Sequence, residues 1–165
     1  MERAISPLKI RLIMSRLLAA LITSVLLTAT AHAQEPMGFR PEEQEGTYFG
    51  SGEGGELTVE LTHQQDDVFA VKIDTVVPTE NDFPGCAGGI EGEMILGPTG
   101  GNLLIENEDY KPASDSPMTS EQYCEVKLVF DEDGFLNLEE QRGCLAYHGA
   151  ACEFTGQVMN SRAAG

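Results

Sequence analysis

Apolar and polar side chains alternate along several short segments of this chain. Residues 56–63 place Leu57 and Leu61 on one face and polar residues on the other, which is the period of a half-buried β-strand. Residues 68–77 repeat the pattern, starting from Phe69. Only the polar stretch Gln-Gln-Asp-Asp separates the two segments, so we predict that they form an antiparallel hairpin.

The same alternation predicts further strands, with turn-forming Gly, Pro, Asn and Asp residues between them. They fall near residues 47–50, 90–96, 102–108, 123–130, 135–141 and 152–158. No segment shows the helical period of about 3.6 residues. The predicted fold class is therefore all-β, a small antiparallel barrel or sandwich of about eight short strands. The first strand contains Tyr-Phe-Gly and the last contains Phe-Thr-Gly, and pairing these two would close the sheet and remove its edges.

An acidic stretch from Asp131 to Gly134 separates two of these strands. A calcium-binding loop with this glycine at its sixth place would need a ligand at its first place, where the chain has Val129, and helices on both sides. Because the flanking segments read as strands, we predict a β-turn here.

Residues 1–33 have the three parts of a secretory signal peptide. Four basic residues precede an apolar run at residues 17–29, and Ala31-His-Ala33 supplies a cleavage site. The run is too short for a membrane-spanning helix, which needs about 20 residues. We therefore expect export, with the mature protein in the periplasm or secreted, and no stable membrane span after cleavage.

The chain is expected to have three parts: residues 1–33 as the signal peptide, 34–46 as a flexible acidic leader and 47–160 as a single β-domain. The leader has two prolines and four glutamates and little apolar content. The 132 residues that follow the predicted cleavage site are enough for one domain with a hydrophobic core.

The mature chain is strongly acidic. The whole protein has 10 basic and 27 acidic residues, and the signal peptide accounts for four and one of these, so the mature protein has 6 and 26 and a net charge of −20. Such a surface repels phosphate backbones, which excludes nucleic-acid binding. Solubility alone explains the charge. The alternative is a cationic partner, which would be a basic protein, a cationic peptide or a metal ion.

All cysteines follow the predicted cleavage site, and their even number in an exported chain predicts a disulfide-stapled fold. If the strands are traced as a meander, the thiols all fall at one end of the fold. The four residues are Cys86, Cys124, Cys144 and Cys152.

The predicted register of two strands decides the pairing. If Phe130 faces Phe135 across the turn, Cys124 faces Gln141 and lies about three residues, on the order of 10 Å, from Cys144. A disulfide needs Cα atoms within about 7 Å. The pairs expected on this register are Cys86–Cys124 and Cys144–Cys152.

Cys144, His148 and Cys152 are equally spaced and allow three interpretations. Structural zinc takes four ligands, and a cysteine nucleophile with a histidine base needs a free thiol. Export favours the third interpretation, a disulfide loop, with His148 exposed to solvent. As an alternative, Tyr147 and His148 in this loop and Glu153 just after it would be recognition residues. We identify no catalytic residue, metal ligand or cofactor site.

The segment from residue 123 to residue 156 resembles the small cysteine-stapled β-domains of exported proteobacterial proteins, including a domain found in some lysozyme-inhibitor-related proteins. The likeness covers residues 85–156 and rests on the cysteine placement and on the terminal Cys-x-Phe-x-Gly at residues 152–156. This chain lacks the helical part that precedes the domain in those proteins. The resemblance implies a periplasmic β-domain and is compatible with inhibition of a cationic lysozyme.

Together these observations predict an acidic exported domain that acts as a binding or protective module, with inhibition of a cationic protein such as lysozyme as its specific form. One alternative is an exported factor that acts on a host or on neighbouring cells. The other is a hydrolase of unknown type, although no pattern in the sequence argues for catalysis.

Overall fold

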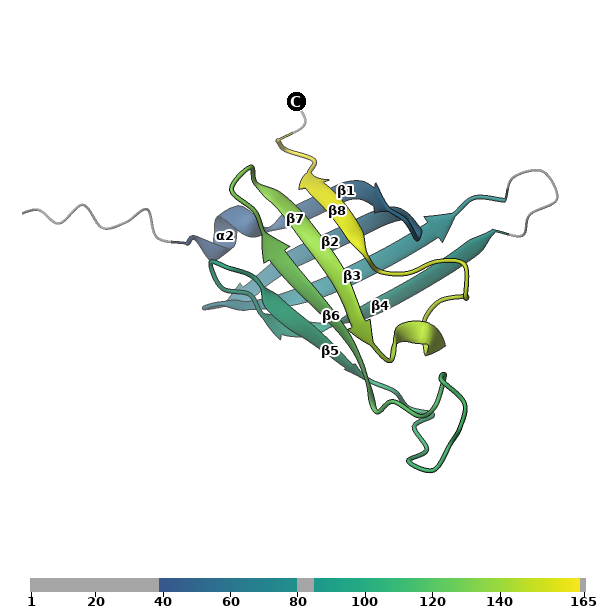
Figure 1. Cartoon of the computed structure of the whole chain (residues 1–165). Helices are drawn as coiled ribbons and strands as arrows, with labels where there is room; N and C mark the ends of the chain where they lie inside the picture. The colour runs from purple at the N-terminus through teal and green to yellow at the C-terminus, as the bar shows by residue number, and fades with distance from the viewer. Residues whose placement is uncertain (1–38, 80–84, 164–165) are drawn as a thin grey trace, which may run out of the picture. The chain divides into compact units, whose positions relative to one another are not determined.

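Eight antiparallel strands form one continuous sheet that curves into a nearly closed barrel in the computed structural model (Figure 1). The structure describes residues 39–79 and 85–163, so the predicted signal peptide lies outside the described residues. The all-β prediction is confirmed, and a barrel is the architecture observed. The strands are β1 (Gly46–Gly52), β2 (Gly55–Gln65), β3 (Val68–Val77), β4 (Cys86–Ile95), β5 (Gly101–Glu106), β6 (Tyr123–Phe130), β7 (Phe135–Arg142) and β8 (Gly156–Asn160).

The strand order joins two four-stranded meanders. It runs β4-β3-β2-β1-β8-β7-β6-β5, and the meanders meet where β1 pairs with β8. Tyr48 of β1 faces Asn160 of β8 across this junction. The predicted pairing of the first and last strands is therefore confirmed, although β8 begins at Gly156, four residues later than predicted.

Inward-facing side chains from all eight strands pack into one hydrophobic core. The alternation predicted for β2 and β3 holds, because Leu57, Leu61 and Phe69 are all buried. Burying a side chain of this size contributes about 1.5–3 kcal/mol, so a filled interior stabilises the barrel. The buried cluster contains Tyr48, Leu57, Val59, Leu61, Phe69, Val71, Ile73, Ile90, Met94, Leu96, Leu103, Cys124, Val126, Leu128, Leu136, Leu138, Cys144, Phe154 and Val158.

The end of the predicted flexible leader is folded. Pro41–Gln44 forms the short helix α2, with proline in its first turn. The hydroxyl of buried Tyr48 donates a hydrogen bond to the backbone carbonyl of Gln44, 2.8 Å away, and Arg162 donates to two carbonyls of the same segment. Residues 41–44 of the predicted leader are therefore helical and supply the acceptor that the Tyr48 hydroxyl needs, and Gly46 already belongs to β1.

The connection between β6 and β7 is the turn that the sequence predicts. One carboxylate oxygen of Asp131 accepts hydrogen bonds from the backbone N–H groups of Asp133 and Phe135, at 3.1 and 2.9 Å. The other accepts from the side-chain amides of Asn137 and Gln157, at 3.0 and 3.2 Å. The hydrogen bond from Asn137, supported by the backbone N–H groups, holds the pKa of Asp131 below its usual value.

Replacing this carboxylate should destabilise the barrel in a pH-dependent way. The variant Asp131→Asn turns an amide group towards the donors of Asn137 and Gln157, so its melting temperature should be lower than that of the wild type at pH 7. A lowered folded-state pKa stabilises the fold above the unfolded pKa of about 3.9, and that contribution is lost as the pH falls through the folded pKa.

Thermal unfolding followed by circular dichroism between pH 2.5 and 7 measures the difference. The difference in melting temperature between Asp131→Asn and the wild type should shrink towards zero in acid. Glu132→Gln, in the same turn, is the control and should change little at any pH. A difference for Asp131→Asn that stays constant down to pH 2.5 would contradict the assignment.

Candidate functional site

Two disulfide bonds form, and their pairing differs from the prediction. Cys86 is bonded to Cys152, with 5.8 Å between their Cα atoms, and Cys124 is bonded to Cys144, with 4.4 Å. The segments that carry them meet at one end of the barrel, as the meander predicts (Figure 1). The predicted pairs Cys86–Cys124 and Cys144–Cys152 are wrong.

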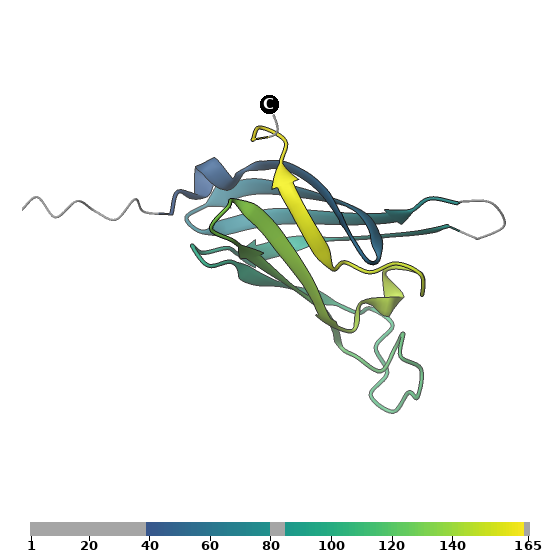
Figure 2. The ribbon, with the colours of Figure 1, turned by 45° about the horizontal axis from the view of Figure 1, so that its top comes forward.

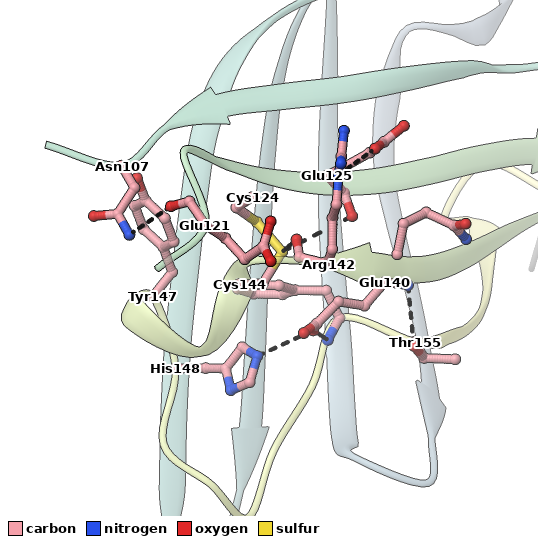
Figure 3. Close-up of a disulfide and its surroundings, with 12 residues drawn as sticks. Asn107, Glu121, Cys124, Glu125, Glu140, Arg142, Cys144, Tyr147, His148 and Thr155 are labelled. Atoms are coloured by element: carbon pink, nitrogen blue, oxygen red, sulfur yellow. Dashed lines mark hydrogen bonds and ion pairs between the residues drawn. A yellow bond between two sulfur atoms is a disulfide. The ribbon is translucent and has the colours of Figure 1, made fainter. Parts of the chain in front are cut away.

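The error lies in the register of β6 and β7. Phe130 faces Leu136 rather than Phe135, which shifts the pairing by one residue. A β-bulge leaves Gln141 of β7 without a partner in β6, and it shifts the register of the two strands by one further residue. The two shifts bring the cysteine near the start of β6 within disulfide distance of the cysteine that follows β7 (Figure 3).

The disulfides fasten one segment to two different strands. Cys144, in the short 3₁₀ helix η1 (Cys144–Ala146), is bonded to β6, and Cys152 is bonded to the first residue of β4. We call residues 144–152 the closing loop. In the predicted pairing this loop would have been closed on itself, whereas in the structure it links two parts of the barrel.

The barrel is left open between β4 and β5, the two edge strands of the sheet. They are connected by a turn in which the backbones of Gly97 and Gly100 exchange two hydrogen bonds, at 3.1 and 3.0 Å. Past this turn, the described residues contain no β4–β5 ladder, and the two strands diverge (Figures 1 and 2). We call this boundary without a ladder the seam, and side chains cross it, because Ile105 of β5 lies against Gly92 of β4.

The closing loop covers the wide end of the seam. The N–H of Gly89 in β4 donates to the backbone carbonyl of Tyr147, 3.2 Å away, and Gly88 and His148 form an isolated antiparallel bridge. On the opposite side, the Tyr147 hydroxyl donates to the carbonyl of Glu106 at the end of β5, 2.8 Å away. Tyr147 therefore contacts both edges and takes the place of the absent ladder.

His148 is packed inside the closing loop. Its side chain is 5% exposed, and Nε2 lies 3.0 Å from a carboxylate oxygen of Glu140, whose side chain is 17% exposed (Figure 3). The same oxygen accepts the backbone N–H of Phe154 at 3.1 Å, and Nδ1 lies 2.9 Å from the carbonyl of Gly149. Both ring nitrogens therefore lie within hydrogen-bonding distance of an oxygen acceptor. The prediction that His148 is exposed is wrong, because this pairing holds the ring against the barrel.

Tyr147 borders an acidic hollow of about 260 Å³ at the end of β5. Glu106, Glu108 and Asp109 line the hollow with it. Burial, followed by the nearby charges of Glu108 and Glu106, raises the pKa of Tyr147 above its usual value. The phenol therefore stays neutral and acts as a hydrogen-bond donor.

Glu153, the third predicted recognition residue, lies apart from Tyr147. It lines a smaller hollow of about 160 Å³ together with Glu53 and lies against Gly54, in the connection between β1 and β2. The structure therefore places Tyr147 and His148 together in the closing loop but puts Glu153 on another surface. Their role in binding stays a prediction.

A larger hollow of about 380 Å³ lies on the outer face of β2, β3 and β4. Lys72 stands in a row between Glu60 and Glu91, and Glu93 completes the acidic lining. The Lys72 ammonium pairs with Asp74 at 2.7 Å. That hydrogen bond and the surrounding carboxylates raise the pKa of Lys72. The lysine neutralises only part of the charge, so the hollow remains acidic.

The disulfides exclude two of the interpretations of the Cys-His-Cys motif. Cys144 and Cys152 are both oxidised, so they serve neither as zinc ligands nor as a nucleophile. Within residues 39–79 and 85–163, no group of three His, Cys, Asp or Glu side chains is arranged to hold a metal ion. Sequence reasoning missed Glu140, which no periodic pattern links to His148. The outward glutamates of β4 were visible as alternate residues of a predicted strand.

Peptide mapping of the unreduced protein should recover the observed linkages. In a chain-entropy estimate, the longer Cys86–Cys152 loop stabilises the fold by about 4 kcal/mol and the Cys124–Cys144 loop by about 3 kcal/mol. Urea unfolding should therefore show a larger loss of stability when both cysteines of Cys86–Cys152 are replaced by serine than when both cysteines of Cys124–Cys144 are replaced. Recovery of a Cys86–Cys124 peptide would show that the register is wrong.

Removing the carboxylate of Glu140 should loosen the closing loop. Glu140→Ala leaves His148 and the N–H of Phe154 without their acceptor, which should cost about 1–3 kcal/mol. The amides of Gly89 and Phe154 should then exchange with solvent faster. Glu139→Ala, at the exposed neighbouring position, is the matched control. Equal effects of the two variants would contradict a structural role for the Glu140–His148 pair.

No protein-family model, curated protein or solved structure matches this chain. The resemblance to cysteine-stapled β-domains therefore stays a prediction. The function has to follow from the barrel itself, from its filled core, its closing loop and its acidic outer surface.

Proposed function

We propose that this barrel is an exported binding module that captures a cationic protein or peptide on its outer surface. Inhibition of a cationic enzyme such as lysozyme is the specific form of that function. The observation that carries the proposal is the lining of the outer surface, because three separate hollows there are each bordered by at least two carboxylates. The mature net charge of −20 extends the same field over the rest of the domain.

The filled interior supports binding at the surface. Small up-and-down barrels that carry ligands hold them in an internal cavity. Here side chains from all eight strands pack together as one core. A partner that meets this molecule therefore meets its outer face, its turns and its closing loop.

The geometry of the histidines favours binding over hydrolysis. His148 bonds to Glu140 and a backbone carbonyl, and His63 bonds to the carbonyl of Asp66, 2.7 Å from Nε2. A histidine base for an acyl-transfer nucleophile would instead bond to a hydroxyl or thiol. Neither described histidine has such a partner, so neither supports an acyl-transfer hydrolase.

Export is part of the proposal. Two disulfides are compatible with an extracellular or periplasmic protein, since such bonds form and persist in oxidising compartments. Among residues 39–79 and 85–163, no helix combines the length and the apolar character needed to cross a membrane. The predicted signal peptide supports passage out of the cytoplasm, with the periplasm or the medium as the final location.

Mature protein mixed with lysozyme should slow the lysis of bacterial cell walls at low micromolar concentrations. Association should weaken steeply with salt, because the screening length falls to about 10 Å at 0.1 M. Surface plasmon resonance at several salt concentrations measures the rates. Lysozyme with acetylated lysine amines is the control and should bind far more weakly. Absence of both binding and inhibition at low salt would remove the lysozyme form of the proposal.

A further inference from the structure

The two disulfides differ in how far they are buried. Cys124 and Cys144 are 0% and 1% exposed and belong to the hydrophobic core, so a reductant reaches their bond only after the barrel opens (Figure 3). Cys152 is 4% exposed, but Cys86 is partly exposed, and neither residue belongs to the core cluster. The Cys86–Cys152 bond is therefore the disulfide that lies nearer to the surface.

Both cysteines of this bond border hollows on the surface. Cys86 lines a hollow of about 360 Å³ whose other described lining residues, such as the exposed Val76, are uncharged. Cys152 lines the smaller hollow of about 160 Å³ that also contains Glu53 and Glu153. A thiolate that approaches from the Cys86 side therefore has more room and does not meet these two carboxylates.

The closing loop leaves the Cys86 sulfur uncovered where the two come closest. Gly149 of the loop lies against this sulfur, and an added Cβ at Gly149 would come within 2.8 Å of Sγ of Cys86. Because glycine has no side chain, the loop places no side-chain atom over the sulfur at this point. Exposure of a sulfur to an attacking thiolate is one of the factors that set the rate of disulfide exchange.

The Cys86–Cys152 bond is the covalent link between the closing loop and β4. Apart from this bond, the loop and β4 are joined by an isolated β-bridge and by the hydrogen bond of 3.2 Å from Gly89 to the carbonyl of Tyr147. The other end of the loop is bonded to β6 through Cys144. Breaking the Cys86–Cys152 bond therefore frees the loop from one edge strand and leaves its covalent anchor to β6 in place.

We propose that Cys86–Cys152 is a site of thiol–disulfide exchange with an external dithiol, and that its reduction detaches the closing loop from β4 while the barrel stays folded. A thiolate of the dithiol attacks Sγ of Cys86, the S–S bond breaks, and Cys152 leaves as a thiolate that takes a proton from water. The second thiol of the dithiol then attacks the mixed disulfide, so that Cys86 is released as a thiol and the dithiol is oxidised. Two electrons and two protons pass from the dithiol to the protein.

The geometry explains why a dithiol is needed and which sulfur it attacks. The Cα atoms of Cys86 and Cys152 lie 5.8 Å apart, so after attack by a monothiol the released Cys152 thiolate re-forms the original bond. Only a second thiol on the reductant completes the reduction. Attack on Cys86 is favoured over attack on Cys152, because the carboxylates of Glu53 and Glu153 repel an anion that enters the hollow at Cys152.

Timed reduction of the oxidised wild-type protein tests the exchange. Dithiothreitol is added at about pH 8, where part of a thiol with a pKa of about 8.5 is ionised, and the free thiols are alkylated and mapped. Cys86 and Cys152 should become labelled at least about tenfold faster than the two core cysteines. The circular dichroism of the β-sheet should be retained at that stage, and the amide of Gly89 should exchange at least about tenfold faster than in the oxidised protein.

Two further measurements identify the sulfur that is attacked. Glutathione, a monothiol, should give a mixed disulfide on Cys86 and little complete reduction. Val76→Glu places a carboxylate in the hollow at Cys86, next to Ala87 on β4, and should slow reduction at least about threefold at low salt, with the effect lost as salt screens the charge. Leu104→Glu, at an equally exposed position on β5, is the matched control and should reduce at the wild-type rate.

Equal reduction rates for the two disulfides would overturn the proposal, because both bonds would then open only with the whole barrel. Loss of the β-sheet spectrum as soon as Cys86–Cys152 is reduced would do the same, since the bond would then hold the fold and not the loop alone. Recovery of glutathione on Cys152, or equal rates for Val76→Glu and Leu104→Glu at low salt, would show that the thiolate does not enter through the hollow at Cys86.

Discussion

A sheet that curls into a barrel has to satisfy the backbone hydrogen bonds of its last two edges, and this requirement organises the molecule. Six of the eight strands have a neighbour on each side, and β4 and β5 have only one. Exposed edges of this kind invite pairing with other chains. This barrel covers the wide end of its opening with an irregular segment and leaves carboxylates along the remainder.

The closing loop needs strong anchors because it has no regular ladder to hold it. Two disulfides fix its ends, and the Glu140–His148 pair fixes its middle. A hydrogen-bonded pair of this kind adds only modest net stability, but it restricts the loop to few alternative arrangements. We attribute the placement of the closing loop to this pair. The stability of the fold comes mainly from the hydrophobic core and the disulfides.

The strands could be predicted because one side of each faces a hydrophobic core, so that apolar and polar residues alternate along the sequence. Leu57 and Phe69 are buried for this reason. The disulfide pairing could not be predicted, because it depends on the β-bulge at Gln141 and on a one-residue difference in the turn at Asp131. Neither the bulge nor the turn produces a periodic pattern in the sequence. Likewise, His148 reads as an exposed loop residue until β7 brings Glu140 beside it.

The nested order of the disulfides has a consequence for the time course of folding. During synthesis Cys86 emerges first and Cys124 next, but the native partner of Cys86 is the last cysteine of the chain. Oxidation in order of appearance would join Cys86 to Cys124, which is a non-native bond. Cys86 must therefore remain reduced until Cys152 has been synthesised, or a thiol–disulfide exchange must correct the first bond. The nesting therefore makes the order of oxidation, and not only the presence of an oxidant, a condition for reaching the native pairing.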